Sequence, residues 1–157
     1  HELKADEAKK NFAAAGLADR VEIYIGKAEE ILPYITGSYQ LILLDGPKGQ
    51  YAAFASMLIP LLETGGLLIC DNVLFRGMVT GDRRIKSRKR TLVKKLDMFL
   101  RALSADSSLM TSIVPIGDGI SISLKLKTQI IGQRYPGISS LNAFFRNLFC
   151  LLYTSPS

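Results

Sequence analysis

The chain has 157 residues, of which 48% are hydrophobic and 22% charged, a balance typical of one globular domain with a core of its own. Its apolar runs are well short of the roughly 18–20 residues that a membrane helix needs, so we expect no membrane partner. The single histidine, His1, argues against a catalytic triad or a histidine metal cluster, and two cysteines favour a reducing, cytoplasmic location over a disulfide framework.

The predicted elements alternate between helices and strands. Helical patterns cover residues 5–15, where Gly16 ends the helix, then 28–35, 50–63 and the amphipathic stretch 87–104. Strand patterns cover 21–26 (VEIYIG), 39–45 (YQLILLD), 65–71 (GGLLICD), 109–117 and 119–127, and the last two join at a Gly-Asp-Gly hairpin signal. This order predicts an α/β fold with a mostly parallel sheet and an antiparallel C-terminal hairpin. The continuous apolar strands 39–45 and 65–71 are typical of strands buried on both faces.

The two ends of the chain differ from this pattern. The sequence begins at His1 inside a helical pattern, which we interpret as a truncated N-terminus. Residues 128–157 are apolar and then rich in Ser and Pro, and no sheet partner for them is evident. We therefore expect a domain over residues 1–127 and a tail, 128–157, outside the native domain. The alternative is a genuine C-terminal helix.

Two of the apolar strands end in an acid. Asp45 is followed by Lys48 three residues later, and Asp71 is followed directly by Asn72. The carboxyl ends of neighbouring parallel strands lie about 4.8 Å apart, so these side chains can share one small ion. Two carboxylates and an amide are oxygen ligands that suit Mg²⁺. The alternative is that each Asp is only a turn or helix-capping residue.

The basic residues are concentrated in one block. Residues 83–95 (RRIKSRKRTLVKK) hold eight of the twenty Lys and Arg residues and no acid, within a chain of net charge +6. Such a block favours a polyanionic partner, and a solvated loop and helix face is the alternative.

Four stretches now carry a family resemblance: GKAEEILP, LILLDGPKGQY, LLETGGLLICDNVLFRGMV and VPIGDGISIS. Over residues 1 to about 127 the chain resembles the cation-dependent class I S-adenosylmethionine O-methyltransferases, which include catechol and caffeoyl-CoA O-methyltransferases. KGQY, DNVLFRGMV, the basic connection and PIGDGISIS resemble most closely the bacterial tRNA 5-hydroxyuridine methyltransferases. The family often forms homodimers, although nothing in these residues shows a dimer.

The resemblance implies roles for particular residues. Asp45, Asp71 and Asn72 would bind the metal, and Lys48 would assist deprotonation of the attacking hydroxyl. Gly26, Ala28 and Glu29 lie where the family contacts the adenine of S-adenosylmethionine, and Asp45 is counted with this cofactor set as well. For Ala28 the start of a helix is an equally good interpretation.

The resemblance also implies a missing part. The glycine-rich cofactor loop and the ribose-binding acid belong upstream of His1, and Glu2 falls inside the following helix, so we do not assign it to the ribose. The first two strands of the family, which lie between the strands corresponding to 21–26 and 39–45, are missing. We expect half the cofactor pocket to be absent, one sheet edge to be exposed and the fragment to be inactive by itself.

The expected reaction is Mg²⁺-dependent methyl transfer to a hydroxyl of a substrate with two adjacent oxygens. We expect 5-hydroxyuridine at the wobble position of a tRNA anticodon loop as the substrate, giving 5-methoxyuridine, because a basic surface suits a phosphate backbone. The RNA-contacting residues would be Arg76, Arg83, Arg84, Lys86, Arg88, Lys89 and Arg90; for Arg76 a plain surface charge is the alternative. Two other functions stay open: a methyltransferase for small catechol-like molecules, and an RNA-binding remnant without catalysis.

Overall fold

From residue 28 to the C-terminal hairpin, the helices and strands alternate as predicted. The computed structural model describes residues 2–81, 89–127 and 148–152. Its helices are α1 (Glu2–Ala14), α2 (Ala28–Ile31), α3 (Tyr51–Leu58) and α4 (Arg90–Ala105), with 3-10 helices η1 (Ala18–Arg20), η2 (Leu32–Tyr34), η3 (Lys48–Gln50) and η4 (Ile59–Leu61). Its strands are β1 (Tyr39–Asp45), β2 (Leu62–Asp71), β3 (Leu109–Val114), β4 (Ile120–Lys125) and β5 (Leu148–Leu152). None of the described helices has the length and apolar character that a membrane crossing requires.

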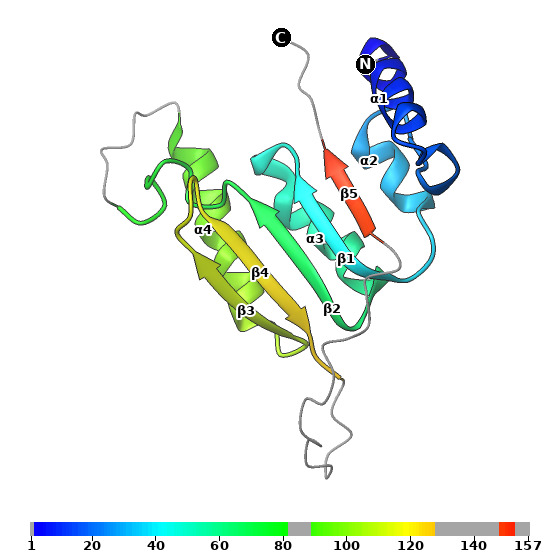
Figure 1. Cartoon of the computed structure of the whole chain (residues 1–157). Coiled ribbons are helices and arrows are strands. Elements are labelled where there is room, and N and C mark those ends of the chain that lie inside the picture. Colours follow the sequence, from blue (N-terminus) through cyan, green and yellow to red (C-terminus); the bar gives the residue numbers. More distant parts are fainter. Residues whose placement is uncertain (1, 82–88, 128–147, 153–157) are drawn as a thin grey trace.

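The strands form one mixed sheet in the order β3-β4-β2-β1-β5 (Figure 1). β1 pairs in parallel with β2 and with β5, whereas β4 runs antiparallel to both β2 and β3. Four strands therefore point the same way and β4 alone is reversed. The predicted α/β class and the antiparallel C-terminal hairpin are confirmed.

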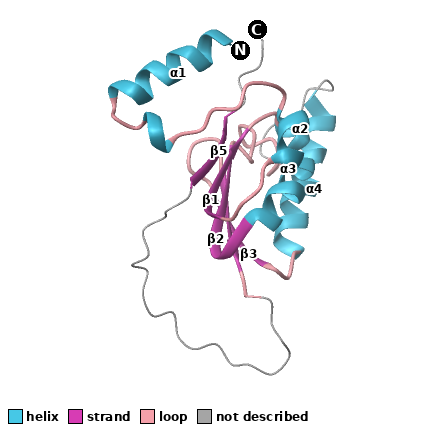
Figure 2. Ribbon diagram, turned by 90° about the vertical axis from the view of Figure 1, so that its right-hand side faces the viewer, coloured by secondary structure: helices cyan, strands magenta, loops and turns pink. Residues whose placement is uncertain are grey.

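Helices α2, α3 and α4 cover one face of this sheet, while α1 lies toward the other side (Figure 2). The amphipathic pattern of α4 explains its position, because its buried residues recur at helical spacing and form one apolar stripe. These residues are Val93, Leu96, Phe99, Leu100 and Leu103. Four of them, Leu96, Phe99, Leu100 and Leu103, belong to the same core as Ile42, Leu44 and Leu68 of β1 and β2. Each fully buried leucine contributes roughly 1.5–3 kcal/mol.

The second face of the sheet is less buried than predicted. Ile42 and Leu44 are fully buried, but their neighbours Leu41 and Leu43, which point to the opposite face, are only partly buried. β2 alternates in the same way over residues 66–71. The prediction that both faces are buried is therefore wrong for the described residues, because α2, α3 and α4 all lie on the same side (Figure 2).

The predicted strand at 21–26 does not form. Residues 21–25 have no regular secondary structure, and Tyr24 and Ile25 are 57% and 48% exposed. Val21 has an extended backbone, φ −127° and ψ 124°, so the local preference is present. Within the described ranges this segment lies outside the five-stranded sheet. An extended segment becomes a strand only when a neighbour satisfies its N–H and C=O groups.

Two predicted helices end early, in each case at a proline. α2 stops at Ile31 and continues as the 3-10 turn η2, which contains Pro33. The helix predicted to reach residue 63 stops at Leu58, passes into η4 with Pro60 and gives way to β2 at Leu62. Proline lacks the N–H that an α-helix needs at this point, and its ring clashes with the preceding turn.

The tail contributes an edge strand, contrary to the expectation that it has no sheet partner. Residues 148–152 form β5, which pairs with Leu41–Asp45 of β1 in continuous parallel register. The edge of β1 that we expected to be exposed is therefore paired. The physical reason is that a strand edge presents unpaired backbone groups, which an apolar segment such as LFCLL can satisfy. The domain boundary at residue 127 stays a prediction.

Candidate active site

The two strand-end acids lie side by side at one edge of the sheet. β1 and β2 are neighbouring parallel strands (Figure 1). Leu44 pairs with Cys70 in the register, so Asp45 and Asp71 each follow a paired residue. Adjacent strands lie about 4.8 Å apart. The arrangement predicted from the sequence, with both acids at the carboxyl edge, is present in the structure.

Lys48 pairs with Asp45. Lys48 lies in η3, directly after β1, and its Nζ is 2.8 Å from Asp45 Oδ1. The Lys48 side chain is only 18% exposed. This burial is the largest influence and lowers the pKa of Lys48, but hydrogen bonds and charge interactions with Asp45 and Tyr51 together outweigh it, and the net pKa is raised. In the arrangement described here Lys48 is therefore an ammonium at neutral pH.

Asn72 is held against Asp71. The Asp71 Oδ1 atom accepts hydrogen bonds from the backbone N–H of Asn72 at 2.6 Å and from its side-chain Nδ2 at 3.0 Å. Asn72 has a φ of 55°, a left-handed conformation that asparagine adopts more readily than most residues. With the amide nitrogen turned toward Asp71, the amide oxygen is the atom left for a cation.

Tyr51, which the sequence analysis did not single out, joins the two strand ends. Its hydroxyl is within donating distance of two carbonyl oxygens, that of Asp71 at 2.9 Å and that of Leu44 at 3.2 Å. It also accepts a longer hydrogen bond from the Gly46 N–H at 3.4 Å. The side chain is fully buried, edge-to-face against Phe99 of α4 with ring centroids 5.6 Å apart.

Burial is the main cause that raises the pKa of Tyr51, so the hydroxyl stays protonated and able to donate. The Lys48 ammonium also lies 5.4 Å from the centre of the Tyr51 ring. The available sequence signal was the position of Tyr51 at the start of α3, three residues after Lys48.

The predicted cofactor residues lie at the start of α2. Ala28 is buried in the core, which agrees with its alternative role as a packed helix start, whereas Gly26 and Glu29 are exposed. A Cβ at Gly26 would come within 3.0 Å of Ile31 Cδ1, so the chain passes close to α2 there. Asp45, the fourth predicted cofactor residue, lies in β1 and interacts with Lys48. No interaction described for this part of the chain joins it to the start of α2.

Three of the predicted RNA-contacting residues lie near the segment that follows Asp71. Arg76 is exposed in the loop after Asn72, and Arg90 is exposed at the first position of α4. The Lys89 Nζ lies 5.3 Å from the ring centre of Phe75, which connects the start of α4 with that loop. Four other predicted residues, Arg83, Arg84, Lys86 and Arg88, lie outside the described residues.

The donor set fits a hard divalent cation. Within the described ranges there is no group of three or more His, Cys, Asp or Glu residues that could hold a metal ion. The predicted set has two carboxylates and one amide, all partly exposed at the strand ends. Mg²⁺ keeps several waters and takes few protein oxygens, so Asp45, Asp71 and Asn72 match its chemistry.

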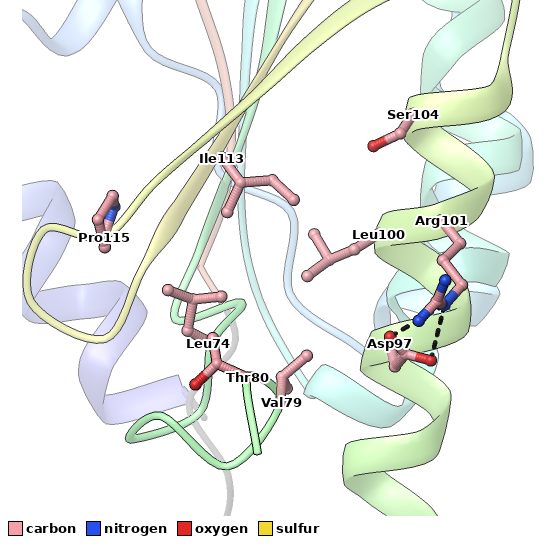
Figure 3. Close-up of a pocket in the computed structure, with 9 residues that line it drawn as sticks. All are labelled: Leu74, Val79, Thr80, Asp97, Leu100, Arg101, Ser104, Ile113 and Pro115. Atoms are coloured by element: carbon pink, nitrogen blue, oxygen red, sulfur yellow. Dashed lines mark hydrogen bonds and ion pairs between the residues drawn. The ribbon is translucent and has the colours of Figure 1, made fainter. Parts of the chain in front are cut away.

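A mostly apolar groove of about 430 Å³ lies beside the loop that follows Asp71 (Figure 3). Its walls come from that loop (Leu74, Val79), from α4 (Leu100), from β3 (Ile113) and from the residue that follows β3 (Pro115). Asp97 and Arg101 of α4 form an ion pair at the groove, with Nε and Oδ2 3.0 Å apart. Leu74 thus belongs both to the groove and to the loop that follows the candidate metal ligands.

Comparison with known proteins identifies the family. The sequence profile of the O-methyltransferase family matches residues 2–126, most of the chain. The chain belongs to the O-methyltransferase family. It is 32% identical over 126 residues to the caffeoyl-CoA O-methyltransferase of Eucalyptus gunnii, a match that covers 74% of this chain and 49% of that protein. The chain thus spans about half the length of the curated relatives it matches.

Solved structures of methyltransferases share the fold. A Staphylococcus aureus structure, provisionally named a caffeoyl-CoA O-methyltransferase, is 33% identical with a TM-score of 0.69, covering 80% of this chain and 61% of that one. The methyltransferase PaMTH1 of Podospora anserina, solved with S-adenosylhomocysteine bound, is 27% identical with a TM-score of 0.65, covering 76% and 55%.

Proposed function

We propose that this chain transfers a methyl group from S-adenosylmethionine to a hydroxyl of a small, catechol-like molecule, with Mg²⁺ bound by Asp45, Asp71 and Asn72. The observation that carries the proposal is the pair of acids side by side at the ends of parallel strands, with Lys48 against one and Asn72 against the other. The relative named as a caffeoyl-CoA O-methyltransferase supports a small aromatic acceptor. This acceptor replaces the tRNA nucleoside as our first choice.

The residues of the chain divide the work. Asp45 and Asp71 bring two negative charges to one edge, and Asn72 adds a neutral oxygen. Mg²⁺, when bound there, supplies Lewis acidity worth several kcal/mol toward the ionised hydroxyl. Lys48, kept protonated by its raised pKa, stabilises the negative charge that develops on the acceptor oxygen as the hydroxyl proton passes to water.

The cofactor would lie between the end of β1 and the start of α2. Gly26, Ala28 and Glu29 would contact the adenine, and Asp45 would contribute from β1. The S-adenosylhomocysteine bound to PaMTH1 supports S-adenosylmethionine as the methyl donor. We place the enzyme in the cytoplasm, in keeping with a free, buried Cys70.

A second candidate acceptor is 5-hydroxyuridine in a tRNA anticodon loop. The observation that favours it is charge: Arg76 lies in the loop that follows the candidate metal ligands, and Lys89 and Arg90, which belong to the basic block 83–95, lie near that loop. A phosphate backbone would give binding that weakens steeply with salt, whereas a catechol would not.

The test is methyl transfer from labelled S-adenosylmethionine by protein that contains these residues, with and without a chelator. The acceptors are caffeoyl-CoA, a catechol and, separately, tRNA carrying 5-hydroxyuridine. Asp71→Ala should lower kcat/KM for the true acceptor by about a hundredfold or more, because several kcal/mol of charge stabilisation are lost. Asp19→Ala, an exposed acid of η1, is the control and should change little.

The outcomes separate the candidates. Chelator-sensitive labelling of the small molecules alone supports the proposal. Labelling of tRNA alone supports the second candidate and gives the basic residues a role in docking. If none of the acceptors is labelled, the proposed function is contradicted, whereas the description of the fold is unaffected.

A further inference from the structure

The turn between β3 and β4 is bonded to the loop that follows the candidate metal ligands. The turn is Gly117-Asp118-Gly119, the hairpin signal of the sequence. The Val73 N–H donates to the Gly119 carbonyl at 2.9 Å, and the Leu74 N–H donates to the Asp118 carbonyl at 2.9 Å. The Asp118 carboxylate then accepts the Arg76 N–H at 2.8 Å. Three hydrogen bonds thus tie residues 73–76 to a turn more than 40 positions away.

The loop held in this way has an unfavourable backbone. Asn72, Phe75 and Arg76 have φ values of 55°, 47° and 57°. These values lie in the left-handed region, which residues other than glycine rarely adopt. Each such residue costs roughly 1–2 kcal/mol, so the conformation persists only where surrounding contacts fix it. The first of the three, Asn72, is a candidate metal ligand. The bonds from Asp118 and Gly119 begin at the very next residue.

The two segments also require close backbone approach. Gly119 has a φ of 83°, and a Cβ there would overlap the side chain of Leu74. Leu74 lies between the turn and the apolar groove (Figure 3). Val73 beside it is fully buried. The loop is therefore fixed by packing on one side and by the turn on the other.

Closing the hairpin turn does not require the hydrogen bond that the Asp118 side chain makes. The turn is already closed by its own backbone, since the Gly119 N–H donates to the Ile116 carbonyl at 2.9 Å. The carboxylate instead reaches the Arg76 N–H in the other loop. A charged acceptor makes this hydrogen bond stronger than one between neutral groups.

We propose that Asp118 is a positioning residue for the metal site: through Arg76, it holds the loop in the conformation that presents the Asn72 amide beside Asp71. This role rests on the metal site of the proposed function. Asp118 is not one of the proposed metal ligands. Residues that orient metal ligands typically change metal affinity by 10–100-fold when they are replaced.

The test measures Mn²⁺ binding to the full chain by electron paramagnetic resonance, without cofactor or acceptor. Asp118→Ala should bind Mn²⁺ at least tenfold more weakly than the parent, while Asp118→Asn, which keeps an acceptor oxygen at this position, should recover most of the affinity. The matched control is Asp106→Ala. The Asp106 carboxylate also accepts a backbone N–H, that of Ser108, at 2.8 Å. It lies before the first residue of β3, however, at the other end of this strand from the turn that contains Asp118.

A second measurement separates positioning from general loss of stability. Amide exchange in the metal-free chain should become faster at Leu74 and Arg76 in Asp118→Ala and not in Asp106→Ala. Mn²⁺ affinity equal to the parent in Asp118→Ala, or an equal loss in Asp106→Ala, would overturn the role of Asp118 and leave the proposed function intact. If the parent binds no Mn²⁺, or binds it no more tightly than Asp71→Ala does, the proposed metal site is wrong, and the role of Asp118 is wrong with it.

Discussion

At the scale of single residues, Tyr51 holds the two strand ends of the candidate site together. Its hydroxyl contacts the carbonyl oxygens of Leu44 and Asp71. Leu44 directly precedes Asp45 at the end of β1, and Asp71 is the last residue of β2. The ring is fully buried in the core beneath them. The same residue therefore contributes to stability and keeps the ends of β1 and β2 together.

Tyr51→Phe should lower the free energy of unfolding by about 1–3 kcal/mol, because the substitution removes a buried hydroxyl and leaves its partners unsatisfied. Urea unfolding followed by circular dichroism measures the change. Tyr34→Phe is the matched control, since Tyr34 is 82% exposed, and it should have little effect. Equal changes in the two variants would contradict the structural role given to the Tyr51 hydroxyl.

The sequence predicted the acids and their neighbours better than it predicted this tyrosine. Asp45 and Asp71 follow apolar strands, and parallel register alone places such residues side by side. Lys48 and Asn72 are close in sequence to their partners. The hydroxyl of Tyr51 instead bonds to Asp71, 20 positions away, and no local pattern specifies that contact.

At the scale of elements, the connection from α3 to β2 depends on a distant lysine. The Lys125 Nζ, at the end of β4, donates to the carbonyl oxygens of Ile59 and Leu62 at 2.8 Å each and lies 3.4 Å from that of Pro60. The last carbonyls of a helix have no partner within the helix, and a cation there also interacts favourably with the helix dipole.

Lys125→Met should reduce the free energy of unfolding by about 1.5–3 kcal/mol, the range for hydrogen bonds that involve a charged group. Methionine keeps the length of the side chain, so the loss reports the ammonium. Lys127→Met, at an exposed position just beyond β4, provides the comparison by thermal and urea unfolding. A Lys127 variant as unstable as the Lys125 variant would show that the carbonyl contacts contribute nothing specific.

Element boundaries followed local chemistry only in part. β1 has the predicted bounds, because its apolar run is interrupted by polar residues at both ends. The helices predicted to run through Pro33 and Pro60 end before these prolines, because apolar periodicity continues past a proline whereas the backbone N–H that a helix needs does not. The segment 21–26 has a strand-like sequence but lies outside the described sheet, and pairing depends on the rest of the fold.

At the scale of the whole molecule, a segment far along the chain, β5, forms one edge of the described sheet. β5 covers the edge of β1 over Leu41–Asp45, next to the candidate site. Sequence reasoning placed this segment outside the domain because a short apolar run does not reveal which edge it will join. The half-exposed second face was also unexpected, since burial depends on where helices from other parts of the chain pack.

Removal of residues 148–157 should expose the edge of β1. We expect concentration-dependent self-association in light scattering, and faster amide exchange in β1, because an unpaired apolar edge can pair with another chain. Removal of residues 153–157 alone keeps β5 and is the control. Unchanged association and exchange after the longer deletion would show that β5 does not protect this edge.

The parallel pairing of β5 also has a practical consequence for protein production. Leu152 is the register partner of Asp45, so β5 ends beside the candidate metal ligands, and residues 153–157 of the sequence follow it. Five extended residues span at most about 17 Å. A hexahistidine tag fused after Ser157 would bring imidazoles within reach of Asp45 and Asp71 and would compete for the same ion. A purification tag therefore belongs at the other terminus, whereas a fluorophore attached after Ser157 would sit close enough to report occupancy of the site.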